Sequence, residues 1–430
     1  MNQLKPYLKP YLKETILAPL FKLFEAILEL FVPLIMAVII DKGIGNQDTS
    51  LILHQGSILI GLGILGVVVS ITAQYFAAKA ATGFTADVRQ ALFSKIQYFS
   101  FSQLDALGND TLLTRLTSDI NLVQNGLNIA LRLLLRSPFI VGGAIVMAFV
   151  VNVEMAWIFV ITVPILAVVV FGIIYWTIPM YRRVQDRLDR IMRLVHENLL
   201  GVRVIRAFNR EEKEIHTFRE DTETLNQAQQ KVSGLSGAMN PITFVIVNVA
   251  LIVILYGGAI KVDTGTLSKG DVIALTNYMS QILVELVKFA NLVVTMTKSV
   301  ASAERIDNIL SIEPDMVEGT KEVHPDGEVA VAFKDVTLTY QGDQNAALNH
   351  ISFTALKGQT IGVIGGTGSG KSSLVNMIPR FYDATQGKVE VFGNDVRDYR
   401  FASIRGAVGM VLQKAQLFRG TIADNVRFGY

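Results

Sequence analysis

The 430-residue sequence has no cysteine, few histidines and almost no net charge. Without cysteine there can be no disulfide, no thiolate metal site and no cysteine nucleophile. The histidines are scattered without the spacing of metal ligands, so we expect them to be solvated or structural: His54, His196, His216, His324 and His350. The formal net charge of +2 gives no electrostatic basis for a nucleic-acid partner, and we expect none.

Long apolar stretches are what the sequence has in abundance, since 51% of its residues are hydrophobic. Several stretches approach or exceed the roughly 20 residues that a bilayer-spanning helix needs. Core helices of soluble proteins are seldom so long and so apolar all round. The sequence therefore predicts six membrane spans: Leu17–Ile40, Gln55–Ala78, Ser137–Val153, Met155–Tyr181, Val232–Ile260 and Asp271–Lys298.

The basic residues predict the orientation of these spans. If the N-terminus is cytoplasmic, the outer turns hold only Lys42, Lys261 and Lys269, whereas the inner segments hold Lys5, Lys9 and Lys13 and the many lysines and arginines of residues 79–136 and 182–231. Two inner segments, Lys79–Arg136 and Arg182–Lys231, are long and polar with helical spacing of their apolar residues. We expect each to leave the membrane as a helix and return, reaching roughly 35–40 Å at the rise of an α-helix.

The tips of these arms can also be placed from the sequence. We expect Arg115–Asn121 near the tip of the first arm and Phe208–Lys213 near the tip of the second. At the N-terminus, the tandem repeat Leu4–Tyr7 and Leu8–Tyr11 favours a short basic and aromatic segment on the membrane surface. A flexible tail is the alternative.

A change of pattern near residue 313 marks a second domain. Pro314 and the polar run Glu318–Glu328 indicate a linker, and alternating apolar residues from Val329 onward predict strands. The expected division is an N-terminal interfacial segment at 1–15, a six-helix membrane domain at 16–312, a linker at 313–328 and a second domain at 329–430, which the motif and the resemblance described below identify as the N-terminal part of a nucleotide-binding domain.

The most specific motif is a phosphate-binding loop, which fits G-x-x-x-x-G-K-[ST] at every fixed position. The apolar run Thr360–Ile364 before it predicts a strand, and Ser373–Ile378 after it predicts a helix. In such a loop the backbone N–H groups converge on phosphate oxygens, Lys371 can reach the β- and γ-phosphates, and the Ser372 hydroxyl can ligate Mg²⁺. The predicted nucleotide-binding residues are Gly365, Gly366, Thr367, Gly368, Ser369, Gly370, Lys371, Ser372 and Ser373.

Six spans with long intracellular arms, joined to this loop, resemble an ABC exporter half-transporter of the bacterial multidrug type. The resemblance covers essentially the whole chain. It implies a polytopic α-helical membrane domain followed by an incomplete α/β P-loop NTPase domain. Within that domain, Val336–Tyr340 resembles the adenine-stacking loop and Gly409–Gln413 resembles the glutamine loop. Tyr340 is then expected to stack on adenine and Gln413 to lie near Mg²⁺ and the γ-phosphate, with Lys371 and Gln413 as the catalytic residues.

Other segments extend the resemblance. Val204–Glu211 resembles the second coupling loop of exporters, and Leu417–Ile422 follows the glutamine loop as it does in them. The sequence ends at Tyr430, soon after that loop. We therefore expect a C-terminally truncated chain without the signature motif, the Walker B carboxylate or the switch histidine.

The function that the resemblance implies is ATP-driven export of small amphipathic or hydrophobic compounds by a dimeric transporter of the bacterial inner membrane. ATP and Mg²⁺ are the expected cofactors, and a second half-transporter is the expected partner. Pro379–Asp383, together with Leu417–Ile422, resembles subunits that pair with a different partner, so a heterodimer is favoured. Lipid export by a flippase of the same family is one alternative. A nucleotide-gated channel or regulatory membrane protein is another.

Three carboxylates within the predicted spans are candidate substrate contacts: Glu25, Glu29 and Glu285. Ionisable residues inside a membrane are costly and usually functional. Either they line the cavity and favour a lipophilic cation, or they are structural. In the structural interpretation Glu25 or Glu29 pairs with Lys22 and Glu285 pairs with Lys288, because these residues are in helical register.

Overall fold

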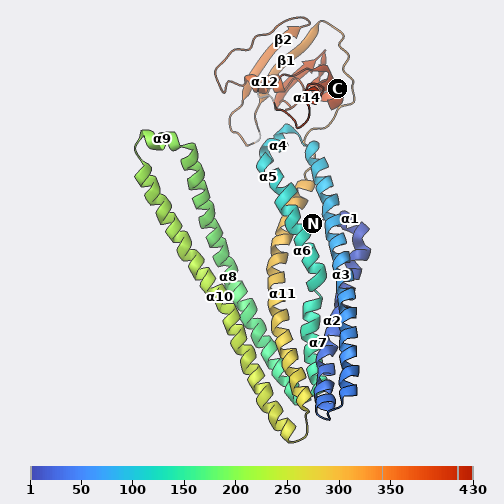
Figure 1. Cartoon of the computed structure of the whole chain (residues 1–430). Coiled ribbons are helices and arrows are strands. Elements are labelled where there is room, and N and C mark those ends of the chain that lie inside the picture. The colour runs from blue at the N-terminus through green and yellow to red at the C-terminus, as the bar shows by residue number, and fades with distance from the viewer. Residues whose placement is uncertain (1, 341, 414–415, 429–430) are drawn as a thin grey trace. The chain divides into compact units, whose positions relative to one another are not determined.

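The structure, a computed structural model, describes residues 2–340, 342–413 and 416–428 (Figure 1). It divides the chain into two compact units. The first unit comprises Met1–Arg89 and Ser118–Asp307, and the second comprises Gln90–Thr117 and Asn308–Tyr430.

The first unit is built from long helices, beginning with two short turns, α1 (Lys5–Leu8) and the 3₁₀ turn η1 (Lys9–Tyr11). The long helices are α2 (Leu12–Val38), α3 (Thr49–Gln97), α6 (Ile120–Leu133), α7 (Arg136–Val151), α8 (Val153–Leu200), α10 (Glu211–Asp263) and α11 (Lys269–Leu310), of which α3 and α11 extend by their last residues into the second unit. Two six-residue elements complete the list: η2 (Ile39–Ile44), the π-helical continuation of α2, and α9 (Val202–Ala207).

Six helical stretches among the described residues are long and apolar enough to cross a membrane: Lys5–Ile44, Thr49–Gln97, Asn109–Val151, Val153–Leu200, Glu211–Asp263 and Lys269–Leu310. Five of the predicted spans lie within one of these stretches, and the third, Ser137–Val153, runs two residues beyond the end of its stretch at Val151. The prediction of six spans is therefore confirmed.

The second predicted arm is also formed as expected. Helices α8 and α10 pack along each other, with α9 between their ends (Figure 1). The chain reverses at Phe208–Arg210, where Asn209 has a left-handed φ of 51°.

The first arm turns earlier than predicted. Helix α3 ends at Gln97, and the short helices α4 (Phe101–Leu107) and α5 (Asn109–Thr114) follow. Arg115–Asp119 instead forms a π-helical turn, η3, in the returning helix, so its assignment to the tip was wrong. The physical reason is local. Ser100 and Gln103 form a capping box that starts α4, and Gly108, at a φ of 75°, separates α4 from α5.

Close contacts fix how the helices of the first unit pack. Gly126 on α6 lies against Ser299 on α11, where an added Cβ would come within 2.1 Å of the serine Oγ. Nearby, Arg305 donates to the buried carboxylate of Asp119. Buried Tyr278 on α11 donates to the carbonyl of Leu30 on α2 at 2.6 Å. Helix α11 is thereby fastened to both α6 and α2.

The N-terminal segment packs on α11 and α3. Leu4 is buried, and the backbone N–H of Gln3 donates to Asp307 on α11. The Tyr11 ring lies over Gly83 on α3, where an added Cβ would be 2.3 Å from the ring, and its hydroxyl donates to Asp87.

The second unit contains a four-stranded antiparallel sheet in the order β2-β1-β3-β4. The strands are β1 (Val329–Leu338), β2 (Leu348–Leu356), β3 (Gln386–Val391) and β4 (Asn394–Asp395). Besides α4 and α5, the unit also contains α12 (Lys371–Asn376), the 3₁₀ turn η4 (Val396–Asp398), α13 (Phe401–Ala407) and α14 (Ile422–Val426). The core forms where inward-facing residues such as Phe333 and Val389 pair across the strands and pack on Met377 and Tyr399.

The strand predicted at Thr360–Ile364 is not formed. A strand exists only where its backbone groups pair with a neighbour, and no described residue pairs with this segment. Because the segment is unpaired, its apolar side chains are exposed to solvent, and Ile364 is 99% exposed.

Candidate nucleotide site

The predicted phosphate loop connects the open segment Thr360–Ile364 to α12. Gly368 and Gly370 have φ values of 84° and 85°, a left-handed conformation that glycine adopts without steric cost. Gly370 is doubly constrained, because an added Cβ would also lie 2.6 Å from the carbonyl oxygen of Ala347. The helix predicted at 373–378 is confirmed in position, although α12 begins two residues earlier, at Lys371.

The Lys371 ammonium lies over this loop. Its Nζ donates to the carbonyl oxygens of Gly365 at 2.9 Å and Gly366 at 2.6 Å. Both acceptors are neutral and exposed. An anionic phosphate oxygen is a stronger partner for an ammonium than a neutral carbonyl, so this lysine is free to exchange its loop contacts for phosphate.

One cavity of about 530 Å³ brings two adjacent predicted site residues together with a third that is distant in sequence. Lys371 and Ser372 come from α12, and Gln413 comes from the segment that follows α13. The other lining residues are Val363, Val375, Asn376, Met410, Val411 and Leu412. The predicted glutamine loop and the end of the predicted phosphate loop therefore line the same cavity.

Tyr340 is connected to the loop by a different route. Its hydroxyl donates to Ser373 Oγ at 2.8 Å, and its ring meets Tyr382 edge-to-face at 5.1 Å. Neither Tyr340 nor Ser373 lines the 530 Å³ cavity. The predicted adenine-stacking tyrosine thus lies beside α12, held by the residue that follows Ser372.

Tyr382 is a residue that the sequence reasoning missed. Its hydroxyl donates to Asp105 on α4 at 2.7 Å, and next to it Phe381 stacks on Phe101 of α4 at 4.4 Å. Burial, and then the hydrogen bond to Asp105, raise the pKa of Tyr382, so it stays a protonated donor at neutral pH. The predicted adenine residue is therefore linked through Tyr382 to α4, at the tip of the first arm.

The membrane carboxylates are all paired. Glu25 pairs with Lys22 at 2.5 Å, and Lys22 also donates to Ser70 on α3. Glu285 pairs with Lys288 at 2.9 Å. Both pairings that the structural interpretation predicted are confirmed.

Arg136 adds contacts that were not predicted. It pairs with Glu285 at 2.9 Å and with Glu29 at 2.6 Å, and Ser137 donates to the other oxygen of Glu285. In the sequence Arg136 stood out only as a basic residue at the end of the first arm. The sequence feature that could have indicated a buried role for Arg136 is its position at the start of a predicted span, next to Ser137 and Pro138.

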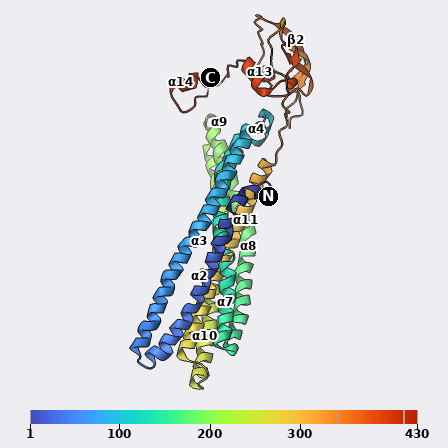
Figure 2. The ribbon, with the colours of Figure 1, turned by 90° about the vertical axis from the view of Figure 1, so that its right-hand side faces the viewer.

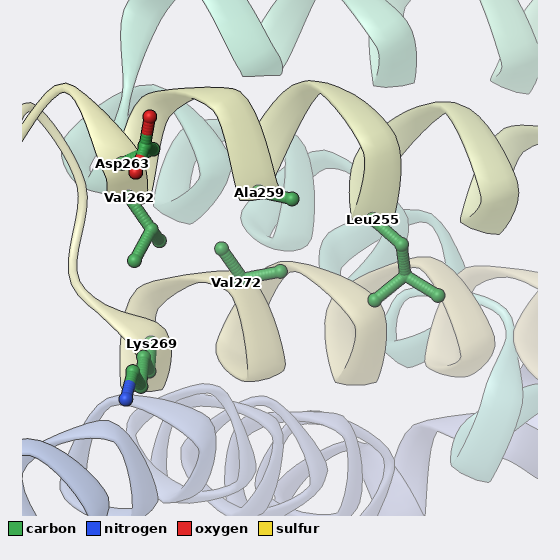
Figure 3. A pocket seen from close by; sticks show the side chains of 6 residues that line it. All are labelled: Leu255, Ala259, Val262, Asp263, Lys269 and Val272. Carbon is green, nitrogen blue, oxygen red and sulfur yellow. The ribbon is translucent and has the colours of Figure 1, made fainter.

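A second cavity, of about 410 Å³, opens between α10 and α11 (Figure 3). Leu255, Ala259, Val262 and Val272 form its apolar wall, and Asp263 and Lys269 lie at the end where the two helices connect. None of the predicted site residues lines it. In the part of the chain that the structure describes, no group of three or more histidines and carboxylates could hold a metal ion.

Comparison with known families supports both halves of the chain. Residues 15–286 match the family described as "ABC transporter transmembrane region", and residues 348–427 match the family described as "ABC transporter".

Several relatives align over nearly the whole sequence. An uncharacterized ABC transporter ATP-binding protein of Mycobacterium tuberculosis is 34% identical over 95% of this chain and 71% of its own length. A protein of Bacillus subtilis with the same description is 33% identical over 100% of this chain and 74% of its own length. An ATP-dependent lipid A-core flippase of Vibrio vulnificus is 25% identical over 94% of this chain and 70% of its own length.

Proposed function

Because the chain belongs to the ABC transporter family, as a half-transporter with its membrane and ATP-binding regions in one polypeptide, we propose that it exports small amphipathic or hydrophobic compounds, driven by ATP. The observation that carries the proposal is the single cavity shared by Lys371, Ser372 and Gln413, in a chain that also holds six membrane-spanning helices. The bacterial inner membrane is the proposed location, with the N-terminus and the nucleotide-binding region in the cytoplasm.

In this proposal, Lys371 neutralises the β- and γ-phosphates and Tyr340 stacks on adenine. Gly365–Gly370 and Ser373 complete the loop that surrounds the phosphates. Ser372 and Gln413 offer a hydroxyl and a carboxamide oxygen, hard donors of the kind that Mg²⁺ prefers. When bound with ATP, Mg²⁺ neutralises phosphate charge.

Nucleotide binding is proposed to reach the membrane helices through α4. The Tyr340–Tyr382 contact and the Tyr382–Asp105 hydrogen bond form a direct path from the adenine residue to that helix. Transport follows if ATP favours one of two conformers of the membrane helices, because a ligand shifts an equilibrium only by its differential affinity.

ABC half-transporters pair with another subunit, and we propose that this one forms a heterodimer. The proposal rests on the likeness of Pro379–Asp383 and Leu417–Ile422 to subunits that pair with a different partner. Transport activity from this gene expressed alone would contradict it.

Lipid export is the second candidate function, favoured by the 25% identity to a relative described as a lipid A-core flippase. A nucleotide-gated channel is the third. Inverted membrane vesicles from cells expressing the gene at its own locus distinguish these functions. ATP-dependent accumulation of an amphipathic dye supports multidrug export, and ATP-dependent transfer of a labelled lipid alone supports a flippase. Passive ion conductance that follows nucleotide binding, without accumulation, would contradict both forms of export.

A further inference from the structure

The segment that follows α11 is fastened along the second unit. Between α11 and β1, residues 311–328 form an extended coil (Figure 2). The backbone N–H of Lys321 donates to the carbonyl of Asp398 at 2.9 Å. An added Cβ at Gly319 would lie 2.1 Å from the carbonyl carbon of the same aspartate, so the coil passes very close to η4. The fastened part, Val317–Val323, is called the linker strap below.

The linker strap contacts α13, one of two elements that lead to the nucleotide cavity. The backbone N–H of Phe401 donates to the Glu318 carboxylate at 2.9 Å. The backbone N–H of Val323 donates to the hydroxyl of Ser403 at 2.7 Å. Helix α13 is followed by the segment that carries Gln413, which lines the cavity of about 530 Å³. One wall of that cavity is therefore connected to the strap.

Arg380 connects the strap to the second element, the turn that follows α12. Its guanidinium donates to both carboxylate oxygens of Asp383, at 2.8 and 3.1 Å. It also donates to the carbonyl of Val317 in the strap at 3.0 Å and to the carbonyl of Arg397 at 3.2 Å. The side chain is only 3% exposed and lies over the ring of Phe401, 5.0 Å from its centroid. Hydrogen bonds made away from water in this way are strong and hold a fixed geometry.

The backbone of Arg380 points to a role for its side chain. The turn is a Schellman motif, in which the N–H of Phe381 donates to the carbonyl of Asn376 and the N–H of Arg380 donates to the carbonyl of Met377. The position that Arg380 occupies in this motif is left-handed and is usually glycine. Arg380 has a φ of 54°, which costs an arginine more than a glycine. Such strain persists where the side chain makes contacts that glycine cannot make.

Helix α12 joins this turn to the phosphate loop. It has six residues and is therefore about 9 Å long at 1.5 Å per residue. Lys371 and Ser372 at its start line the nucleotide cavity, and Arg380 follows its end. Because short rigid elements carry coupling between their ends, a ligand that holds the start of α12 also restricts the turn at its end.

We infer that Arg380 is a positioning residue that passes nucleotide binding from α12 to the linker strap, and so to α11, which the strap follows in the chain. This route is separate from the path through Tyr382 and α4. It rests on the proposed function, because it needs ATP to bind at the cavity of about 530 Å³. A purely structural arginine would hold the strap equally well with and without ATP.

The test measures hydrogen exchange of the full chain in nanodiscs, with and without saturating ATP and Mg²⁺. The reporters are the amides of Gly319, Lys321 and Val323, each of which donates to the body of the second unit. In the wild type, ATP should slow their exchange about 5- to 150-fold, the usual range of coupling between two sites. Exchange in the last turns of α11, Ala303–Leu310, should slow as well. An ATP titration sets saturation separately for each variant.

Two variants of Arg380 separate coupling from folding. Arg380→Gly removes the side-chain contacts but places glycine where the Schellman motif favours it. The ratio of strap exchange without ATP to exchange with ATP should then fall close to 1. Arg380→Lys keeps the charge but offers one nitrogen where the guanidinium uses three, so its ratio should lie between those of the glycine variant and the wild type. The control is Arg397→Gln, which removes another arginine–aspartate pair of the same unit, with Asp395, and should keep the wild-type ratio.

An insertion tests the connection to α11. Four glycine and serine residues between Pro314 and Asp315 separate α11 from the linker strap and leave the contacts of the strap in place. ATP should still slow exchange at the strap and should no longer slow it at Ala303–Leu310. Persistence of the ATP effect on α11 in this variant would contradict the route.

The outcomes for the inference and for the proposed function are distinct. Wild-type protein that binds ATP without slower exchange at the strap would overturn the inference. An undiminished ratio in Arg380→Gly and Arg380→Lys would also overturn it and leave Arg380 a structural residue only. Absence of ATP binding in the wild type would instead contradict the proposed function.

Discussion

Tyr382→Phe should loosen the tip of the first arm. The change removes only the hydroxyl that donates to Asp105 at 2.7 Å and leaves the ring packed against Tyr340 and Phe101. A hydrogen bond to a charged group contributes about 1.5–3 kcal/mol. The stacking of Phe101 on Phe381 at 4.4 Å remains, and it contributes about 0.5–1.5 kcal/mol. Helix α4 should therefore stay docked but open more often.

Hydrogen exchange of the α4 amides measures this opening. If exchange proceeds through local undocking, a loss of about 1.5–3 kcal/mol corresponds to a roughly 10- to 150-fold faster rate. Asp105→Ala should give a similar increase, and the double variant should add little, because both single changes remove the same bond.

Tyr399→Phe is the matched control. Tyr399 is equally an inward-facing tyrosine of the second unit, but its hydroxyl donates to the carbonyl of Val391 at 2.8 Å. This variant should speed exchange in the sheet and leave α4 unchanged. Unchanged α4 exchange in Tyr382→Phe, or full additivity with Asp105→Ala, would refute the reasoning.

Variants at two further positions test the adenine contact and the helix packing of the first unit. Tyr340→Ala should weaken ATP binding by roughly 1–3 kcal/mol if the ring stacks on adenine. Tyr340→Phe loses only the hydrogen bond to Ser373 and should bind ATP nearly as tightly as the wild type. Equal losses of affinity for the two variants in an equilibrium binding assay would contradict stacking. Gly126→Ala should lower the thermal stability of the first unit by about 1–3 kcal/mol through overpacking against Ser299, and Ser299→Gly should restore it; failure of that rescue would show that the close contact is not the cause.

Local signals in the sequence predicted much of this molecule. Apolar length alone identified the six spans, and the fixed spacing of glycine, lysine and serine identified the loop at 365–372. Both patterns depend only on residues that are close together in the sequence. The same holds for the second arm, where the turn at Phe208–Arg210 interrupts a long helical pattern.

Contacts between distant residues were beyond this reasoning. Asp105 and Tyr382 are 277 positions apart, and Arg136 and Glu285 are 149 positions apart. The periodicity of a sequence does not show which charged residues on different helices contact each other. Arg136 was therefore used only to predict which side of the membrane its segment lies on. The strand expected at Thr360–Ile364 failed for a related reason, because strand formation depends on a partner and not only on apolar composition.

The most direct test of the account is ATP binding by the Lys371→Ala variant in nanodiscs. The central claim is that the cavity shared by Lys371, Ser372 and Gln413 holds the phosphates of ATP. Loss of a charge-assisted contact to the phosphates should weaken binding about ten- to hundredfold. Lys388→Ala, which removes a lysine paired with Glu390 on the sheet, should leave the affinity unchanged. Wild-type ATP affinity in Lys371→Ala, with unchanged thermal stability, would contradict the claim.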